Sequence, residues 1–145
     1  MFRRTRHRLA LMVAAGALAV GVAQAPASAD SSAAAAIIDG ASDSGCSTAY
    51  GDYSYSLRPG STDQYSAGWS LWVEDTCSGL VGHIRVRYSE WTGTSWVDSG
   101  WQTIASSASD AQSHDANHLF NVKDVRFAIC DYSSSKGNHN CGYVS

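Results

Sequence analysis

His114 and His118 have the spacing that two metal ligands need on one face of a helix, because they lie four residues apart in the segment HDANH. Asp115 lies beside His114, and a carboxylate can also bind a metal. However, no further ligand is evident nearby, and the segment lacks the H-E-x-x-H pattern of zinc hydrolases. We therefore expect a solvated loop at this position, with no bound metal and no cofactor.

Glu74, Asp75 and Glu90 are the residues that a hydrolase could use as a pair of carboxylates. Glycoside hydrolysis needs two such groups on either side of a cleft that holds the sugar. These three acids lie at the ends of predicted strands, where a carboxylate is usually solvated. The serines offer no stronger signal, since the chain has no G-x-S-x-G nucleophile motif. We therefore expect no catalytic residues and a protein that is not an enzyme.

The chain has four cysteines, Cys46, Cys77, Cys130 and Cys141. They contain no C-x-x-C pair, which disfavours a zinc site. An even number of cysteines in a small exported chain predicts two disulfides, which also leaves no thiol for catalysis. Three pairings are possible. We favour Cys46–Cys77 and Cys130–Cys141, because each bridge joins segments that we expect to pair locally.

The first 29 residues have the three parts of a secretory signal peptide. Four arginines between Arg3 and Arg8 precede the apolar run Leu9–Val22, and the small residues Ala27–Ala29 resemble a cleavage site. The apolar run is shorter than the roughly 20 residues that a membrane-spanning helix needs. We expect a secreted, extracellular protein whose mature chain begins at Asp30.

Removal of the signal peptide would take away four of the ten basic residues and none of the 13 acidic ones, which changes the formal net charge from −3 to −7. An acidic chain repels the phosphates of nucleic acids and of anionic membranes. We therefore expect neither a nucleic-acid partner nor a membrane partner.

The mature chain is dominated by segments in which apolar and polar residues alternate, as they do in a half-buried strand. Gly68–Thr76 and Leu80–Trp91 show this alternation most clearly, and turn residues bound each segment. The pattern predicts an all-β fold, a small antiparallel β-sandwich or barrel with two disulfides and an extended N-terminal arm. The polar segment Ser106–His118 predicts a long loop, with at most one helical turn. The expected strands lie near Tyr53–Leu57, Ala67–Asp75, Val81–Glu90, Ser95–Ile104, part of Leu119–Tyr132, and Cys141–Val144.

The five tryptophans predict either core packing or an exposed binding surface. Trp69 and Trp72 are three residues apart, so on one strand they must point to opposite faces. Trp91 and Trp96 flank the turn TGTS and can face each other across a hairpin. The tryptophans can have a structural role, in which they pack in the core and across a hairpin. Alternatively, Trp72, Trp91 and Trp96 can form a candidate aromatic surface that binds a sugar or a protein.

The segment Asp30–Gly45 contains the run AAAAII, which is too apolar for an ordinary solvated linker. Small side chains allow a backbone to approach another protein closely, so an extended segment of this kind can add to a partner's strand or lie in a groove. Ile37 and Ile38 would be its anchors. A linker left by processing is the alternative. The predicted partner-binding residues are Ala33, Ala34, Ala35, Ala36, Ile37 and Ile38.

The chain resembles the adaptor subunit of actinobacterial umbrella toxin particles. The features that carry the resemblance are this arm, the two cysteine pairs and the closing segment VRFAICDYSSSKGNHNCGYVS. In that family a two-disulfide β domain docks its extended N-terminus in the groove of an alanine-rich helical-repeat stalk, and its body carries a lectin subunit. The resemblance implies an adaptor in an interbacterial toxin complex, with toxicity in another subunit.

Together these features predict a signal peptide over residues 1–29, an extended arm over 30–45 and a disulfide-stapled β domain over 46–145. We expect a secreted, non-catalytic adaptor that binds protein partners, namely a helical-repeat toxin subunit and a lectin subunit. The alternatives are a carbohydrate-binding module that uses exposed tryptophans and a protease inhibitor that presents the loop Asp131–Asn140.

Overall fold

The computed structural model describes residues 34–107, 112–115 and 119–144. Within these ranges the chain forms nine strands and no helix, which confirms the predicted all-β class. None of the described residues belongs to a helix that could cross a membrane. The strands are β1 (Ala34–Ala41), β2 (Ser47–Leu57), β3 (Tyr65–Asp75), β4 (Val81–Trp91), β5 (Trp96–Asp98), β6 (Gln102–Ser107), β7 (Gln112–Asp115), β8 (Leu119–Ser133) and β9 (Gly137–Val144).

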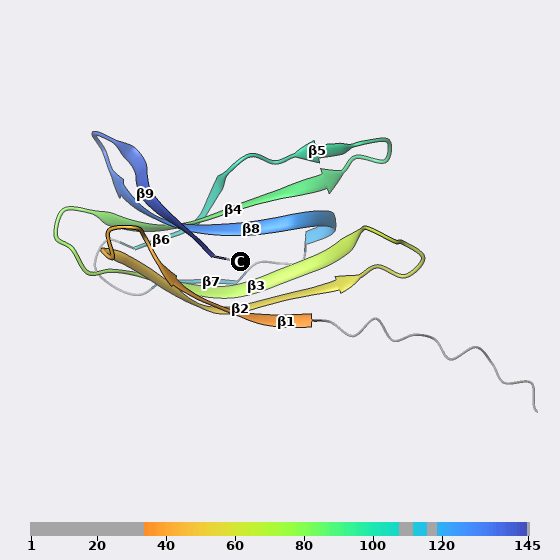
Figure 1. Cartoon of the computed structure of the whole chain (residues 1–145), viewed down its shortest axis with the longest axis horizontal. Helices are drawn as coiled ribbons and strands as arrows, with labels where there is room; N and C mark the ends of the chain where they lie inside the picture. The colour runs from red at the N-terminus through yellow and green to blue at the C-terminus, as the bar shows by residue number, and fades with distance from the viewer. Residues whose placement is uncertain (1–33, 108–111, 116–118, 145) are drawn as a thin grey trace, which may run out of the picture.

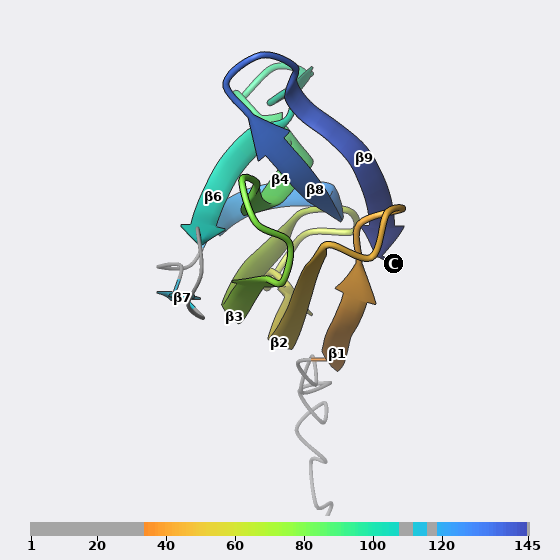
Figure 2. The same cartoon turned by 90° about the vertical axis from the view of Figure 1, so that its left-hand side faces the viewer.

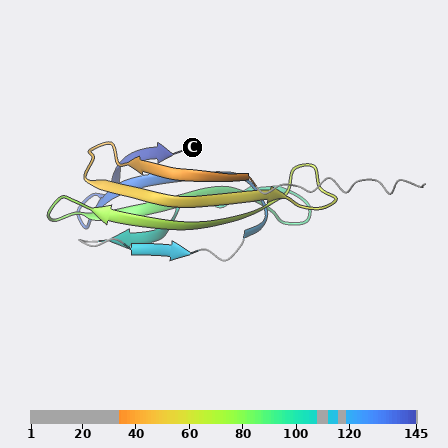
Figure 3. The ribbon, with the colours of Figure 1, turned by 90° about the horizontal axis from the view of Figure 1, so that it is seen from below.

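The strands form one antiparallel sheet that folds over into two layers (Figure 1). One layer contains β1, β2, β3 and β7, which lie side by side in Figure 3. The other contains β9, β8, β4 and β6, with β5 paired to the far end of β4. The start of β8 also pairs with β3, through Tyr65–Val122 and Ala67–Leu119, and so connects the two layers. Of the two predicted alternatives, an antiparallel sandwich or a barrel, the two layers form the sandwich.

The core lies between the two layers and follows the alternation of the sequence. In β3, Leu71 and Val73 are fully buried, whereas Trp72 points outward and is 40% exposed. Trp69 is buried on the same side as Leu71, so the prediction that Trp69 and Trp72 take opposite faces is confirmed. The other layer contributes buried apolar side chains to the same cluster, among them Ile84, Val86, Phe127 and Ile129.

Both predicted disulfides are present. Cys46–Cys77 joins the residue before β2 to the turn after β3, and Cys130–Cys141 joins β8 to β9. No described cysteine is free. Two structural disulfides in so small a domain indicate an oxidising environment.

Two expectations about secondary structure need correction. Residues 34–41 of the expected arm pair with β2 along their whole length, so this part of the arm belongs to the sheet. Residues 112–115 of the expected long loop form β7 on the edge of β3 rather than a loop or helical turn. Residues 30–33, 108–111 and 116–118 lie outside the described part of the chain.

Candidate functional site

The candidate site is the outer edge of β1, the terminal strand of its layer (Figure 3). β1 pairs antiparallel with β2 from Ala34–Tyr55 to Ala41–Thr48. Among the described residues, no strand pairs with its other edge. An edge strand presents a row of backbone N–H and C=O groups that another chain can use. We call the part from Ala34 to Asp39 the β1 edge.

The two isoleucines of β1 have opposite environments, because neighbouring side chains of a strand point to opposite faces. Ile38 is 4% exposed and belongs to the core of the sandwich. Ile37 is 81% exposed and points away from the core. Of the two expected anchors, only Ile37 is therefore available to a partner, and Ile38 attaches the strand to its own domain.

The C-terminal end of β1 lies next to the end of β9, which descends to it in Figure 2. The N–H group of Asp43 donates a hydrogen bond of 2.9 Å to the carbonyl of Asn140. A Cβ atom on Gly142 would lie 2.0 Å from the carbonyl oxygen of Ala41, so the backbones approach closely here because Gly142 has no side chain. These contacts of β9 are with Gly40, Ala41 and Asp43, which follow the β1 edge in the chain.

The β1 edge lacks the features that usually protect an edge strand. Natural edges commonly carry lysine, proline or a bulge. The first five residues of β1 are three alanines and two isoleucines, and Asp39 is the first charged residue. Ala34, Ala35 and Ala36 are all exposed. Their methyl groups give a partner close access to the backbone.

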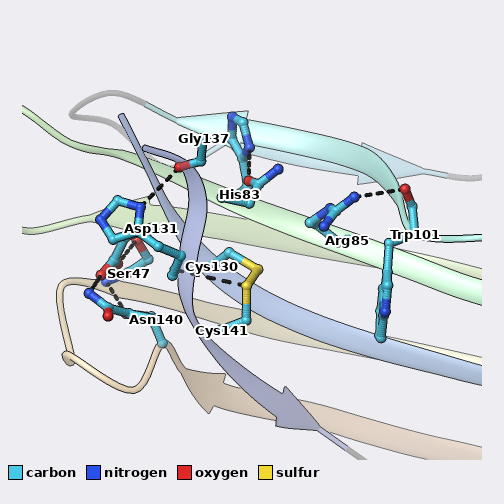
Figure 4. The surroundings of a disulfide bond; sticks show 12 residues. Ser47, His83, Arg85, Trp101, Cys130, Asp131, Gly137, Asn140 and Cys141 are labelled. Atoms are coloured by element: carbon cyan, nitrogen blue, oxygen red, sulfur yellow. Dashed lines mark hydrogen bonds between the residues drawn. A yellow bond between two sulfur atoms is a disulfide. The ribbon is translucent and has the colours of Figure 1, made fainter. Parts of the chain in front are cut away.

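The loop after β1 is held by a buried carboxylate that the sequence analysis did not find. Asp131 is 0% exposed, and it accepts hydrogen bonds from the hydroxyls of Ser44 and Ser47, the latter at 2.8 Å. The side-chain amide of Asn140 donates a third bond at 3.0 Å. Figure 4 shows Ser47 and Asn140 beside Asp131, close to the Cys130–Cys141 disulfide.

Opposing effects act on the pKa of Asp131. Burial raises this pKa, since it disfavours the charged form. Hydrogen bonds from Ser44, Asn140, Ser42 and Ser47 favour the charged form, and the net result is a lowered pKa. The ionised carboxylate therefore ties the end of β1 to β8 and β9, which fixes the orientation of the β1 edge.

The three candidate surface tryptophans do not form one surface. Trp72 lies on the outer face of β3, where its register partner is Tyr50. Trp91 and Trp96 lie on the β4–β5 hairpin of the other layer, with ring centroids 5.4 Å apart. Their predicted cross-hairpin contact is confirmed. The ammonium of Lys123 lies 4.2 Å from the centre of the Trp96 ring, a cation–π contact that partly covers it.

The acids considered for catalysis are not brought together. Asp75 is buried and accepts a hydrogen bond from the N–H of Cys77 at 3.1 Å, while Glu74 points to the other face of β3. Gly82 lies beside the carbonyl of Glu74, and Glu90 is eight residues further along β4, roughly 26 Å away at 3.3 Å per residue.

The remaining candidates give no positive signal. His114 is in β7 and His118 lies outside the described residues; elsewhere in the described chain no group of three potential metal ligands occurs. The segment Asp131–Asn140, considered as an inhibitor loop, is a β8–β9 hairpin that exposes mainly its turn, residues 134–136.

No protein-family model, curated protein or solved structure matches this chain significantly.

Proposed function

We propose that the protein is a secreted, non-catalytic adaptor that joins subunits of an extracellular interbacterial toxin complex. Its partners would be an alanine-rich helical-repeat toxin subunit and a lectin subunit, as the sequence resemblance implies. The signal-peptide pattern and the two disulfides support a role outside the cell.

The observation that carries the proposal is the β1 edge, a strand edge with neither charge nor proline over its first five residues. Alanine side chains let the backbone settle into a groove lined by other small side chains, and the edge N–H and C=O groups can then bond to polar groups of the partner. The docking segment would remain part of the sheet, so less conformational entropy is lost on binding than with a free arm.

Ile37 would be the apolar anchor of this contact. Burial of one isoleucine side chain stabilises a complex by about 1.5–3 kcal/mol. That amount alone does not give tight binding, so backbone hydrogen bonds and alanine contacts must supply the rest. Loss of the Ile37 contact should still weaken binding at least tenfold, because each 1.4 kcal/mol is a factor of ten in affinity.

The test uses two matched variants, Ile37→Asp and Val97→Asp. Both replace an exposed aliphatic side chain by a carboxylate, since Val97 is 49% exposed on the β4–β5 hairpin, in the other layer. Tagged wild-type protein and both variants are incubated with culture medium of the source bacterium, and captured proteins are identified by mass spectrometry.

We expect the wild-type protein and Val97→Asp to capture an alanine-rich helical-repeat chain, and Ile37→Asp to lose it while melting at the same temperature. Capture of that chain by both variants alike would mean that the β1 edge is not the docking site. Capture of no helical-repeat chain by the wild-type protein would refute the adaptor proposal itself.

A further inference from the structure

At the end of the sandwich where β1 begins, the structure has a pocket of about 320 Å³ between the two layers. It lies far along β2 from the Asp131 network, which is near Ser47. The residues that line it are Tyr53, Tyr55, Tyr65, Lys123, Asp124 and Val125. None of them belongs to the β1 edge, and the adaptor proposal does not use the pocket.

Three tyrosines give the pocket an aromatic wall. The rings of Tyr53 and Tyr55 are stacked with centroids 5.6 Å apart, and the ring of Tyr65 meets Tyr55 edge-on at 5.9 Å. Tyr53 also contacts the core residue Phe127 edge-on at 5.2 Å. The ring wall is thus continuous with the core, which keeps it in place without a ligand.

Two features leave the space in front of this wall open. Ala34 and Ala36 are the register partners of Tyr55 and Tyr53 on β1 and share their face of the sheet, but they contribute only methyl groups. On the opposite side, Asn121 and Asp124 have φ values of 59° and 54°, the left-handed region that non-glycine residues rarely adopt. They bend β8 where it passes between β3 and β4.

The polar groups of the pocket are balanced in charge. Lys123 provides one ammonium and Asp124 one carboxylate. The Lys123 ammonium lies 4.2 Å from the centre of the Trp96 ring, so the Trp91–Trp96 pair fixes the position of this lysine head group. The phenol of Tyr53 can donate a hydrogen bond, and burial raises its pKa to about 12, further from neutral pH than the ordinary value.

We propose that this tyrosine pocket binds a neutral saccharide. Aromatic rings pack against the C–H faces of a pyranose ring, while phenols, an ammonium and a carboxylate supply donors and acceptors for its hydroxyls. The charge balance disfavours an anionic or a cationic ligand. The volume is at the low end of the roughly 300–1,000 Å³ range of small-molecule sites, which fits one or two sugar rings.

The test titrates the mature protein with four neutral probes, the tetrasaccharides cellotetraose, maltotetraose, mannotetraose and chitotetraose, and follows backbone amide shifts by NMR. We expect at least one probe to bind with a Kd of about 1 mM or lower, as befits a ligand with few contacting atoms. The shifts should concentrate at residues 53–55, 65 and 123–125. Tetragalacturonate should bind more weakly than the best neutral probe.

Tyr55→Ala and Tyr50→Ala form a matched pair of variants. Both tyrosines are on β2 and are similarly exposed, at 39% and 43%, but only Tyr55 faces the pocket. We expect Tyr55→Ala to weaken binding at least tenfold and Tyr50→Ala to leave it unchanged. Tyr55→Phe, which keeps the ring, should lose about threefold in affinity for the sugar. This variant remains informative if the alanine variant does not fold.

Three results would overturn the proposal: no binding of any neutral probe to the wild-type protein, shifts that concentrate elsewhere, or an equal loss of affinity in Tyr50→Ala. The second of these results would take a specific form if the sugar bound on the outer face of β3: Trp72→Ala would weaken binding and Tyr55→Ala would not. None of these results bears on the Ile37 contact with the adaptor's partner, because Ile37 points away from the pocket.

Discussion

Asp131 shows how a single buried charge can organise one end of this domain. Its carboxylate has no basic partner in the described part of the chain, and hydroxyl and amide donors from the loop after β1, the start of β2 and β9 satisfy it instead. A buried ion is stable only where its hydrogen bonds offset the cost of its desolvation. We therefore expect the domain to depend strongly on this residue.

Replacement of Asp131 by asparagine tests that dependence. An asparagine amide would place two donors where the wild-type residue only accepts, so at least one hydroxyl donor would lose its acceptor. We expect the free energy of unfolding, measured by urea denaturation at pH 7, to fall by about 2–4 kcal/mol. The exposed Asp63→Asn should change it by less than about 0.5 kcal/mol.

The effect of Asp131→Asn should also depend on pH in a defined direction. The folded-state pKa of Asp131 is lowered, so its stabilising contribution is complete above the unfolded pKa of about 3.9 and is lost as the pH falls through the folded value. The difference between wild type and variant should therefore shrink below about pH 4. A difference that stays constant down to pH 2 would contradict the assignment of the charge.

β1 is the element whose role in the structure differs most from the role expected from the sequence. As a free arm it would contribute nothing to the stability of the domain, whereas as a strand it buries Ile38 in the core. The structure therefore predicts that loss of this segment damages the fold as well as any partner contact.

The neighbouring residues Ile37 and Ile38 provide an internal comparison. Ile38→Ala should lower the free energy of unfolding by about 2–4 kcal/mol, because it leaves a cavity between the layers. Ile37→Ala should change it by less than about 0.5 kcal/mol, because the side chain is already in water. Equal and small effects in thermal or urea denaturation would mean that the segment is not packed on the domain.

The sequence predicts the strands in which large apolar and polar residues alternate, and it misses the strands without that alternation. Alternation in β3 and β4 is plain because large apolar residues face the core and polar ones face water. In β1 two neighbouring isoleucines take opposite faces and alanines precede them, and β7 is polar throughout, so neither shows a period of two. Both are recognisable only through the neighbouring strands that they pair with.

The candidate sites also differ in how far they can be predicted from the sequence. Composition points to the β1 edge, because a run of small apolar residues is unusual in a solvated segment. The Asp131 network joins residues 84 and 87 positions apart in the chain, and the tyrosine pocket joins β2, β3 and β8. Such groupings are set by strand register, which is not visible in local sequence patterns.

At the scale of the whole molecule, the two ends of the sandwich are built differently. One end is closed by both disulfides, the Asp131 network and the close approach of β9 to β1. At the other end the pairing of β8 with β3 joins the two layers, and this end contains the tyrosine pocket and the start of the β1 edge. The disulfides and hydrogen bonds of the first end thus hold together the strands whose other ends carry these two surfaces.

Gly142 and Gly40 test whether the β1–β9 closure maintains this arrangement. A methyl group on Gly142 would meet the backbone oxygen of Ala41 at 2.0 Å, so β9 must move away from β1. A methyl group on Gly40 would meet side-chain atoms instead, with the nearest atom of Val144 at 2.4 Å, and a side chain can rotate away more easily than a backbone can move. We therefore expect Gly142→Ala to destabilise the domain by about 1–3 kcal/mol and Gly40→Ala by less.

The decisive measurement is hydrogen exchange at the amide of Asp43, which bonds to the carbonyl of Asn140 across this junction. Gly142→Ala should lower its protection far more than Gly40→Ala does, because protection there requires β9 to remain on β1. The core amides of Leu71 and Ile84 should lose protection only in proportion to global stability. If the Asp43 amide is unaffected in Gly142→Ala, the junction does not close this end, and the orientation of the β1 edge must depend on the Asp131 network alone.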